Sequence, residues 1–393
     1  MRRLLAFALV TLATSLPAQV RTGVDVLAAS GCAELAGRKI GLITNHTGLT
    51  RDGRRTIDVI AAAADCQLVA LFSPEHGIQG KFDAEVADSS DARTGLPIYS
   101  LYGETRSPTD VMLNGIDTLV FDIQDIGCRF YTYVSTLRRA LEAAAAHGLR
   151  CVVLDRPNPI GGVLMAGPIA AADRLDFVAA HRVPLRHGMT PGELAKMMCG
   201  EDGIAVDLQV IACTGWQRAD LFFDTGLTWV NPSPNMRCLT QAMLYPGVGI
   251  VEGTNVSVGR GTDTPFEVLG APWCDGPRLA AELDAAGLPG VRFVPIRFTP
   301  ASSRHKDQEC SGINLIITDW RRFESVRTGI HIACALHRLH GEAWDTARLD
   351  WLLKHAASTK AILAGEKADD IVAGWRRELD LFRMRRKPFL LYE

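Results

Sequence analysis

Four short apolar segments in the first half of the chain constrain its fold more than any other feature. They are Lys39–Thr44, Gln67–Phe72, Thr118–Asp122 and Cys151–Asp155. Each is a continuous apolar run rather than an alternation of apolar and polar residues. Continuous runs are typical of strands that are buried on both faces of a parallel sheet. The sequence therefore predicts such a sheet, with helices covering both of its faces.

Segments with helical character separate these runs. Residues 56–64 and 135–147 are two of them. Ser107 and Thr190 each precede a proline, which places an N-cap residue next to Pro at the first helical position. Glu193 would complete a capping box with Thr190. The resulting β-α-β rhythm predicts an α/β fold with a Rossmann-like parallel sheet.

The chain of 393 residues is long for one hydrophobic core, which rarely exceeds roughly 250–300 residues. After Pro246 the composition changes, because residues 247–270 are rich in glycine and have no regular apolar pattern. Runs of strands and then helices follow, at residues 291–298, 313–318, 325–340, 345–355 and 367–381. We therefore expect a Rossmann-like domain over residues 19–246. A smaller α+β C-terminal domain over residues 247–393 would complete the active-site cleft.

The first 18 residues have the composition of a secretory signal. Arg2 and Arg3 precede an apolar stretch at residues 4–16, and Ala18 offers a cleavage point. The stretch is shorter than the ~20 apolar residues of a membrane span. We expect cleavage after Ala18, an exported protein in the periplasm or outside the cell, and no stable membrane span after cleavage. An uncleaved anchor or a buried first helix is the alternative.

Composition and missing motifs exclude several classes of protein. The 42 basic and 44 acidic residues give a net charge of −2 without a basic stripe, so we expect no nucleic-acid partner. None of the ten cysteines lies in a C-x-x-C pair, and H-E-x-x-H and G-x-S-x-G are absent. Histidines and aspartates occur without a metal-ligand spacing. We therefore expect no metal site.

Polar residues follow each of the four predicted strands. Because parallel strands end at one edge of the sheet, the residues after them should gather in one crevice, where such sheets bind ligands. Helix caps and Asx turns are the alternative, and it applies best to Asn45, Asp155 and Asn158. The candidates at this edge are Asn45, His46, Glu75, His76, Asp122, Gln124, Asp125 and Asn158.

Glu75 is the best candidate for acid-base chemistry. It lies between Pro74 and His76-Gly77, directly after a predicted buried strand. A carboxyl held in such a turn would be partly desolvated, which suits it to donate a proton. A surface glutamate in a loop is the alternative.

The densest polar and aromatic cluster occupies residues 122–133. Carboxylates and amides bind sugar hydroxyls, and the faces of Tyr131 and Tyr133 can stack on a sugar ring. Arg129 can pair with a substrate carboxylate through two parallel hydrogen bonds. An internal ion pair between Asp125 and Arg129 competes with this interpretation.

The glycine-rich segment could supply a second carboxyl from the C-terminal domain, either Glu252 or Glu267. G-x-G-x-x-G and Gly-Lys-Ser/Thr are both absent from it, so we expect neither a nucleotide nor any other cofactor. A glutamate from this segment could face Glu75 across an interdomain cleft, and clefts of this kind are common ligand sites.

Six motifs together resemble the NamZ-type exo-β-N-acetylmuramidase family, which hydrolyses peptidoglycan glycosides. The resemblance covers essentially the whole chain after the signal segment, down to R-R-K-P-F-L-L-Y at its end. The motifs are T-N-H-T-G at 44–48, S-P-E-H-G at 73–77, D-I-Q-D-I-G-x-R-x-Y-T-Y at 122–133, D-R-P-N-P at 155–159, N-P-S-P-N-M at 231–236 and E-G-T-N-V-S-x-G-R-G-T-x-x-P-F-E at 252–267.

The resemblance implies an exo-acting glycosidase that releases N-acetylmuramic acid from the non-reducing end of peptidoglycan fragments, without a cofactor. Glu75 then corresponds to the principal catalytic carboxyl and Glu267 to a second one. Glu252 or the substrate's N-acetyl group could take that second place. The implied substrate-binding residues are Asn45, His46, His76, Asp122, Gln124, Asp125, Arg129, Tyr131, Tyr133, Asn158, Asn235, Glu252, Asn255, Ser257, Arg260 and Thr262.

Two other functions stay open on the sequence alone. A non-catalytic periplasmic protein could bind cell-wall sugars between two closing lobes. A nicotinamide-dependent dehydrogenase could use the same kind of sheet, although the broken glycine spacing counts against it.

Overall fold

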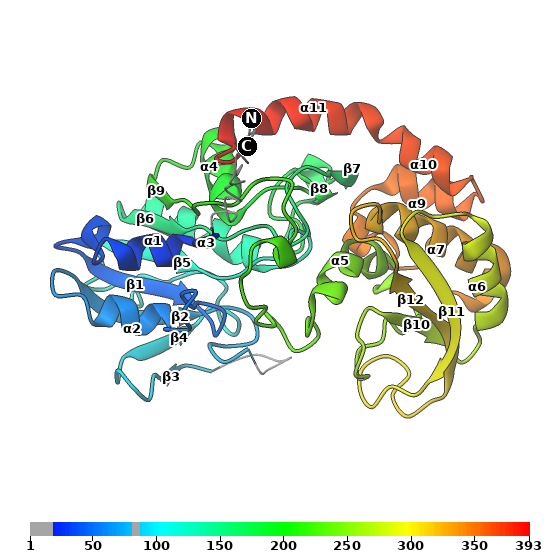
Figure 1. Ribbon diagram of the computed structural model, residues 1–393, viewed down its shortest axis with the longest axis horizontal. Helices are drawn as coiled ribbons and strands as arrows, with labels where there is room; N and C mark the ends of the chain where they lie inside the picture. The colour runs from blue at the N-terminus through cyan, green and yellow to red at the C-terminus, as the bar shows by residue number, and fades with distance from the viewer. Residues whose placement is uncertain (1–18, 81–86) are drawn as a thin grey trace, which may run out of the picture.

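The computed structural model describes residues 19–80 and 87–393, arranged as two units side by side (Figure 1). The predicted signal at residues 1–18 lies outside the described residues. Within the described ranges, no helix combines the length and the apolar character needed to cross a bilayer.

The first unit is built on the predicted parallel sheet, in the order β3-β4-β2-β1-β5-β6-β9. Only the short edge strand β3 is antiparallel to its neighbour. The six parallel strands follow the doubly wound order 3-2-1-4-5-6, which confirms the predicted Rossmann-like fold. The strands are β1 Lys39–Thr44, β2 Gln67–Ser73, β3 Ser89–Ser90, β4 Pro97–Ser100, β5 Thr118–Asp122, β6 Arg150–Leu154 and β9 Asp207–Ile211.

Helices cover both faces of this sheet. On one face, α1 (Gly23–Ala29) and α2 (Thr56–Ala61) pack Val24, Leu27 and Ile60 into a core with inward residues of β1 and β2. On the other face, α3 (Tyr133–Ala146) and α4 (Pro191–Asp202) pack against β5, β6 and β9. Burial on both faces explains why these strands have continuous apolar sequences.

The helix starts and bounds predicted from the sequence were right in some places and wrong in others. Thr190 caps α4 and forms the predicted capping box with Glu193. No helix follows Ser107, because residues 110–115 form turns in which few side chains are buried. The helix predicted at 367–381 is two helices, α10 (Ala368–Gly374) and α11 (Arg376–Arg386).

The second unit contains a three-stranded antiparallel sheet in the order β10-β12-β11, as expected of an α+β domain. Its apolar face packs against α6 and α7, and side chains on the other face of β11 are exposed. The elements are α5 Leu239–Val248, β10 Val268–Ala271, α6 Gly276–Ala285, β11 Val291–Phe298, β12 Cys310–Ile317, α7 Ser325–His340, α8 Asp350–Leu353 and α9 Ala356–Leu363. A small hairpin in the first unit pairs β7 Ala166–Ile169 with β8 Pro184–Arg186.

The two units are connected at two places. The first is α5, which packs on α7 so closely that a Cβ on Gly247 would lie 1.9 Å from the Ser325 carbonyl oxygen. The division expected after residue 246 falls in the last turn of α5 and stays a prediction.

The second connection is α11, which runs back over the first unit (Figure 1). The residues that follow it anchor there. The Tyr392 hydroxyl donates to Asp155 Oδ2 at 2.5 Å, and Arg386 Nη1 donates to the Gly188 carbonyl at 2.7 Å. The end of the segment expected to belong to the second domain is therefore part of the first unit in space.

Candidate active site

A cleft of about 800 Å³ lies between the two units and opens to solvent. The first unit contributes loops that follow its sheet strands, and the second contributes the glycine-rich segment, the loop near residue 303 and α8. Its lining includes Glu75, His76, Tyr131, Thr132, Asn235, Tyr245, Glu252, Arg260, Phe266, Ser303 and Trp351.

Glu75 enters this cleft from the turn that follows β2. The Gly77 amide donates to the Pro74 carbonyl at 3.0 Å, and His76 has a positive φ of 69°, so the chain turns sharply at the strand end. The Glu75 side chain is half-buried, and the Thr132 hydroxyl donates a hydrogen bond to its Oε2. Sequence analysis missed Thr132, although it lies between the two predicted tyrosines.

Aromatic rings from both units form the floor of the cleft. Tyr131 lies edge to face with Tyr133 at 5.0 Å and with Tyr245 at 6.1 Å. Tyr245 packs against Phe266 of the glycine-rich segment at 4.5 Å. Tyr133 lies behind this layer, where its hydroxyl donates to the Pro232 carbonyl at 2.5 Å. Burial, reinforced by the Glu75 carboxylate, raises the pKa of Tyr133 and keeps it a neutral donor.

The two candidate second carboxyls lie in different places. Glu252 lines the cleft and forms an ion pair with Arg260 at 2.5 Å, and the Arg260 guanidinium lies 5.1 Å from the Phe266 ring centre. Glu267 instead accepts a hydrogen bond from Gln241 Nε2 at 3.0 Å, at the start of α5. The two residues share a turn in which Phe266 has a positive φ of 64°, and Phe266 lines the cleft whereas Glu267 does not. Of these two candidates, Glu252 lines the cleft and Glu267 does not, and the described lining also includes the carboxyl of Asp176.

Arg129 has a different role from the one predicted. Its guanidinium is buried and donates to the carbonyls of Pro168, Val183, Leu352 and Leu353 at 2.8–3.2 Å. Burial lowers its pKa to about 10. These partners also differ from the alternative expectation, which was an ion pair between Arg129 and Asp125. Arg129 therefore connects the first unit to α8 of the second, and it is not among the residues that line the cleft.

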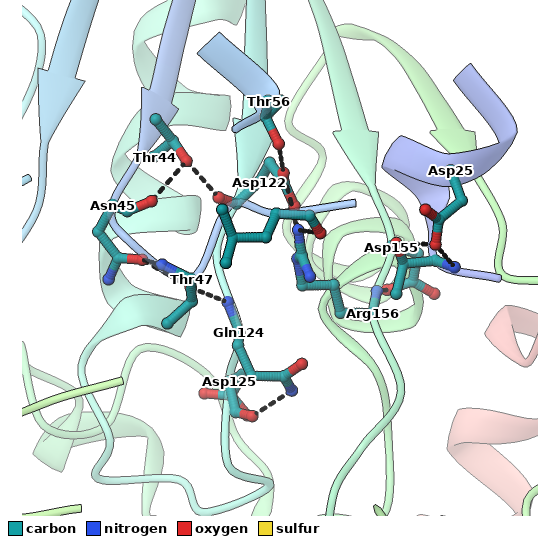
Figure 2. A network of polar contacts seen from close by, with 12 residues as sticks. Asp25, Thr44, Asn45, Thr47, Thr56, Asp122, Gln124, Asp125, Asp155 and Arg156 are labelled. Carbon is teal, nitrogen blue, oxygen red and sulfur yellow. Dashed lines mark hydrogen bonds and ion pairs between the residues drawn. The ribbon is translucent and has the colours of Figure 1, made fainter. Parts of the chain in front are cut away.

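Most other residues predicted at the strand ends bind neighbouring loop and helix residues rather than line the cleft (Figure 2). Asp122 pairs with Arg156 at 2.5 Å and accepts a hydrogen bond from Thr56. Asn45 closes an Asx turn by accepting from the Thr47 amide at 2.9 Å. Gln124 donates to the Pro157 carbonyl at 3.0 Å, and Asn158 donates to the Met189 carbonyl at 3.0 Å. These four residues hold the strand-end loops in position.

The remaining predicted residues divide between the cleft and its supports. His76 and Asn235 line the cleft, while His46 Nε2 bonds to the Asn231 carbonyl at 2.6 Å beneath them. Burial lowers the pKa of His46, and the nearby His76 adds to the effect. Ser257 lines a side pocket next to the cleft. Asn255 donates to the Ala343 carbonyl at 2.8 Å, and Thr262 donates to the Gly259 carbonyl at 2.7 Å, so both shape loops.

The rim of the cleft contains residues that the sequence did not single out. The Arg106 guanidinium lies 4.3 Å from the ring centre of Phe177 and 5.3 Å from that of Tyr102. Next to Phe177 in the chain, Asp176 binds Lys354 at 2.5 Å. These residues are isolated in sequence, so no motif could have indicated them.

Two family models match the chain. The model described as "Exo-beta-N-acetylmuramidase NamZ, N-terminal" matches residues 40–240, and its C-terminal counterpart matches residues 243–392. The chain belongs to the NamZ exo-β-N-acetylmuramidase family. The predicted resemblance is thereby confirmed, and so is the prediction of a glycosidase of this type.

Known proteins match along almost the whole chain. A peptidoglycan β-N-acetylmuramidase NamZ of Bacillus subtilis (strain 168) is 41% identical over 379 residues, which are 95% of this chain and 92% of the relative. Two crystal structures of DUF1343 family proteins from Bacteroides fragilis NCTC 9343 have the same fold. The first has a TM-score of 0.89 at 35% identity and covers 95% of this chain and 99% of its own. The second has a TM-score of 0.80 at 31% identity and covers 96% and 99%.

A buried carboxyl lies below the cleft of this NamZ-family chain. Asp125 Oδ2 accepts from the Gly127 amide at 2.7 Å and lies 3.9 Å from His187 Nε2. Burial raises the pKa of Asp125 to about 7 and lowers that of His187 to about 3. Both side chains are therefore uncharged in mildly acidic solution, and Asp125 ionises near neutral pH.

Asp125 should make the stability of the fold depend on pH. Its pKa rises from 3.8 to about 7 on folding, so the folded state holds a proton that the unfolded state releases. This contribution is fully present below pH 3.8 and is lost as the pH rises through 7. The unfolding free energy of the wild type minus that of Asp125→Asn should fall by a few kcal/mol over this interval. Urea unfolding at several pH values measures it, and a constant difference would contradict the assignment.

Proposed function

We propose that the chain is an exo-acting glycoside hydrolase that releases N-acetylmuramic acid from the non-reducing end of peptidoglycan fragments. Carboxyl acid-base catalysis would take place in the cleft between the two units. Membership of the NamZ family supports the substrate class. The signal predicted at residues 1–18 supports action outside the cytoplasm.

The observation that carries the mechanism is the position of Glu75. It is a half-buried carboxyl in a cleft of about 800 Å³ that also holds a second carboxyl and an aromatic floor. Glycosidases use two carboxyl groups around the scissile bond, one of which protonates the leaving oxygen. Glu75 is assigned this proton-donating role. Thr132 fixes the orientation of its carboxyl group through the hydrogen bond to Oε2.

Glu252 is assigned to the opposite face of the reacting sugar. Arg260 binds its carboxylate at 2.5 Å, which limits the rotation of the Glu252 side chain. A fixed negative charge stabilises the positive charge that develops on the sugar ring during bond cleavage. The substrate's own N-acetyl group could share this role. Tyr131 and Tyr245 offer ring faces and edges on which the sugar can rest.

A comparison of two chromogenic substrates tests the proposal. Purified wild-type protein should release nitrophenol from the β-N-acetylmuramide at least a hundredfold faster than from the β-N-acetylglucosaminide, which lacks the lactyl group. A purified disaccharide with N-acetylmuramic acid at its non-reducing end should yield that sugar as the first product. Tight binding of the muramide without product release would instead indicate the binding protein that the sequence left open.

A further inference from the structure

A side pocket of about 500 Å³ adjoins the cleft on the second unit. The two cavities share Glu252, Arg260, Ser303 and Trp351, so a substrate in the cleft can extend a substituent into the side pocket. The other residues that matter to its chemistry are Arg304, His305 and Arg348. None of these three belongs to the residues that sequence analysis assigned to the site.

The charge of the side pocket is strongly unbalanced. Among the residues that the structure describes, the lining includes three arginines and one acidic residue, Glu252, which is already paired with Arg260 at 2.5 Å. Neither Arg304 nor Arg348 forms an ion pair with any residue in the ranges 19–80 and 87–393. Two guanidinium groups without a carboxylate partner therefore face one concave surface, which favours an anionic ligand.

The loop that contains Arg304 is held in a defined shape. The Ala301 amide donates to the Gly261 carbonyl at 2.8 Å, and His305 Nε2 bonds to the Asn255 carbonyl at 2.7 Å. Gly261 has a φ of 82°, and a Cβ there would lie 2.5 Å from the Ser302 backbone. These contacts hold the glycine-rich segment and the Arg304 loop in a fixed relative position.

Arg348 is positioned by a different contact. Its guanidinium lies 4.4 Å from the ring centre of Trp351, which lines both cavities. Stacking on a ring uses the face of the guanidinium and leaves its N–H edge available for a carboxylate.

We propose that Arg304 and Arg348 form a carboxylate-binding site that selects sugars carrying an acidic substituent. The substituent is the 3-O-lactyl carboxylate of the sugar in the cleft, or a carboxylate of a peptide attached to that lactyl group. This inference rests on the proposed function. It assigns substrate selection to two residues that take no part in bond cleavage.

Replacement of the two arginines by glutamine tests the assignment. For the chromogenic N-acetylmuramide, Arg304→Gln and Arg348→Gln should each raise KM about three- to tenfold, with kcat changed less than threefold. Turnover of the N-acetylglucosaminide, which lacks the carboxylate, should not change. Arg304→Lys should restore part of the affinity. Arg377→Ala, which removes an exposed arginine on α11, serves as the control.

Two modified substrates distinguish the sources of the carboxylate. A muramide whose lactyl group is a neutral amide should bind more weakly and should not respond to either replacement. A muramide with an acidic dipeptide on the lactyl group separates the two cases. Sensitivity of this substrate to the replacements identifies peptide carboxylates as ligands, and insensitivity identifies the lactyl carboxylate alone.

A direct binding measurement separates this inference from the proposed function. Calorimetry should show that free N-acetylmuramic acid binds the wild type more tightly than N-acetylglucosamine does, and that Arg304→Gln/Arg348→Gln abolishes the preference. If the double variant keeps the wild-type KM and preference, the inference is overturned, even if turnover confirms the glycosidase. If the wild type does not cleave the muramide, the proposed function fails. The calorimetric preference for N-acetylmuramic acid over N-acetylglucosamine then tests the carboxylate-binding site by itself.

Discussion

Replacing Glu75 with Gln should lower kcat on the chromogenic N-acetylmuramide by about a thousandfold while leaving the fold intact. General acid catalysis contributes about 10²–10⁴-fold, and an amide cannot supply the proton. The amide has nearly the shape of the carboxyl and can still accept the hydrogen bond from Thr132. Steady-state kinetics with purified variants measures the loss, and far-ultraviolet circular dichroism checks the fold.

The same substitution at two other glutamates provides matched controls. Glu267→Gln should retain nearly full activity, because its side chain binds Gln241 outside the cleft. Glu252→Gln should lose activity on the order of tenfold or more, since it weakens the ion pair with Arg260 and removes a negative charge from the cleft. If Glu75→Gln turned over substrate at a rate near that of the wild type, or if Glu267→Gln were the inactive variant, the assignment would be wrong.

Replacing Arg156 with Met should destabilise the fold by roughly 3–5 kcal/mol. Asp122 lies at the end of the central strand β5, is fully buried, and pairs with Arg156 through two contacts of 2.5 and 2.9 Å. Removing the guanidinium leaves the Asp122 carboxylate buried with the Thr56 hydroxyl as its remaining side-chain donor. Urea unfolding monitored by tryptophan fluorescence measures the change.

Two further variants show whether an unpaired buried charge causes this loss. Asp122→Asn combined with Arg156→Met should recover a large part of the lost stability, because the double variant no longer buries a charge without a partner. Arg383→Met breaks an ion pair with Asp380 that is about 60% exposed, and it should change stability by less than about 0.5 kcal/mol. A double variant as unstable as the single one would point to lost packing around the Arg156 side chain instead.

The sequence predicted the best-packed elements with their bounds. β1, β5 and α7 begin and end at the predicted residues. The elements that it missed are less distinctive. β4 and β9 flank the parallel sheet, and their side chains are only partly buried, so their sequences lack an apolar run. A strand whose side chains are only partly buried needs fewer apolar residues, so its sequence is harder to recognise as a strand.

The site was harder to predict than the fold because a motif does not specify side-chain direction. Glu252 and Glu267 belong to one motif and are of one residue type, yet only Glu252 faces the cleft. Arg129 lies in the same motif as Tyr131, but its guanidinium is surrounded by four backbone carbonyls. A motif indicates which segments approach the site, and packing decides which side chains reach it.

The sequence by itself determined the doubly wound sheet, the α+β second unit, the family and the position of Glu75 at a strand end. All of these depend on local patterns, namely apolar runs, caps and residues next to one another in the chain. The tertiary structure decided which distant groups meet. It placed Glu252 rather than Glu267 in the cleft with Glu75, buried Arg129, and brought Arg304 and Arg348 to one pocket. Those outcomes depend on how the two units pack together, and no local pattern encodes that geometry.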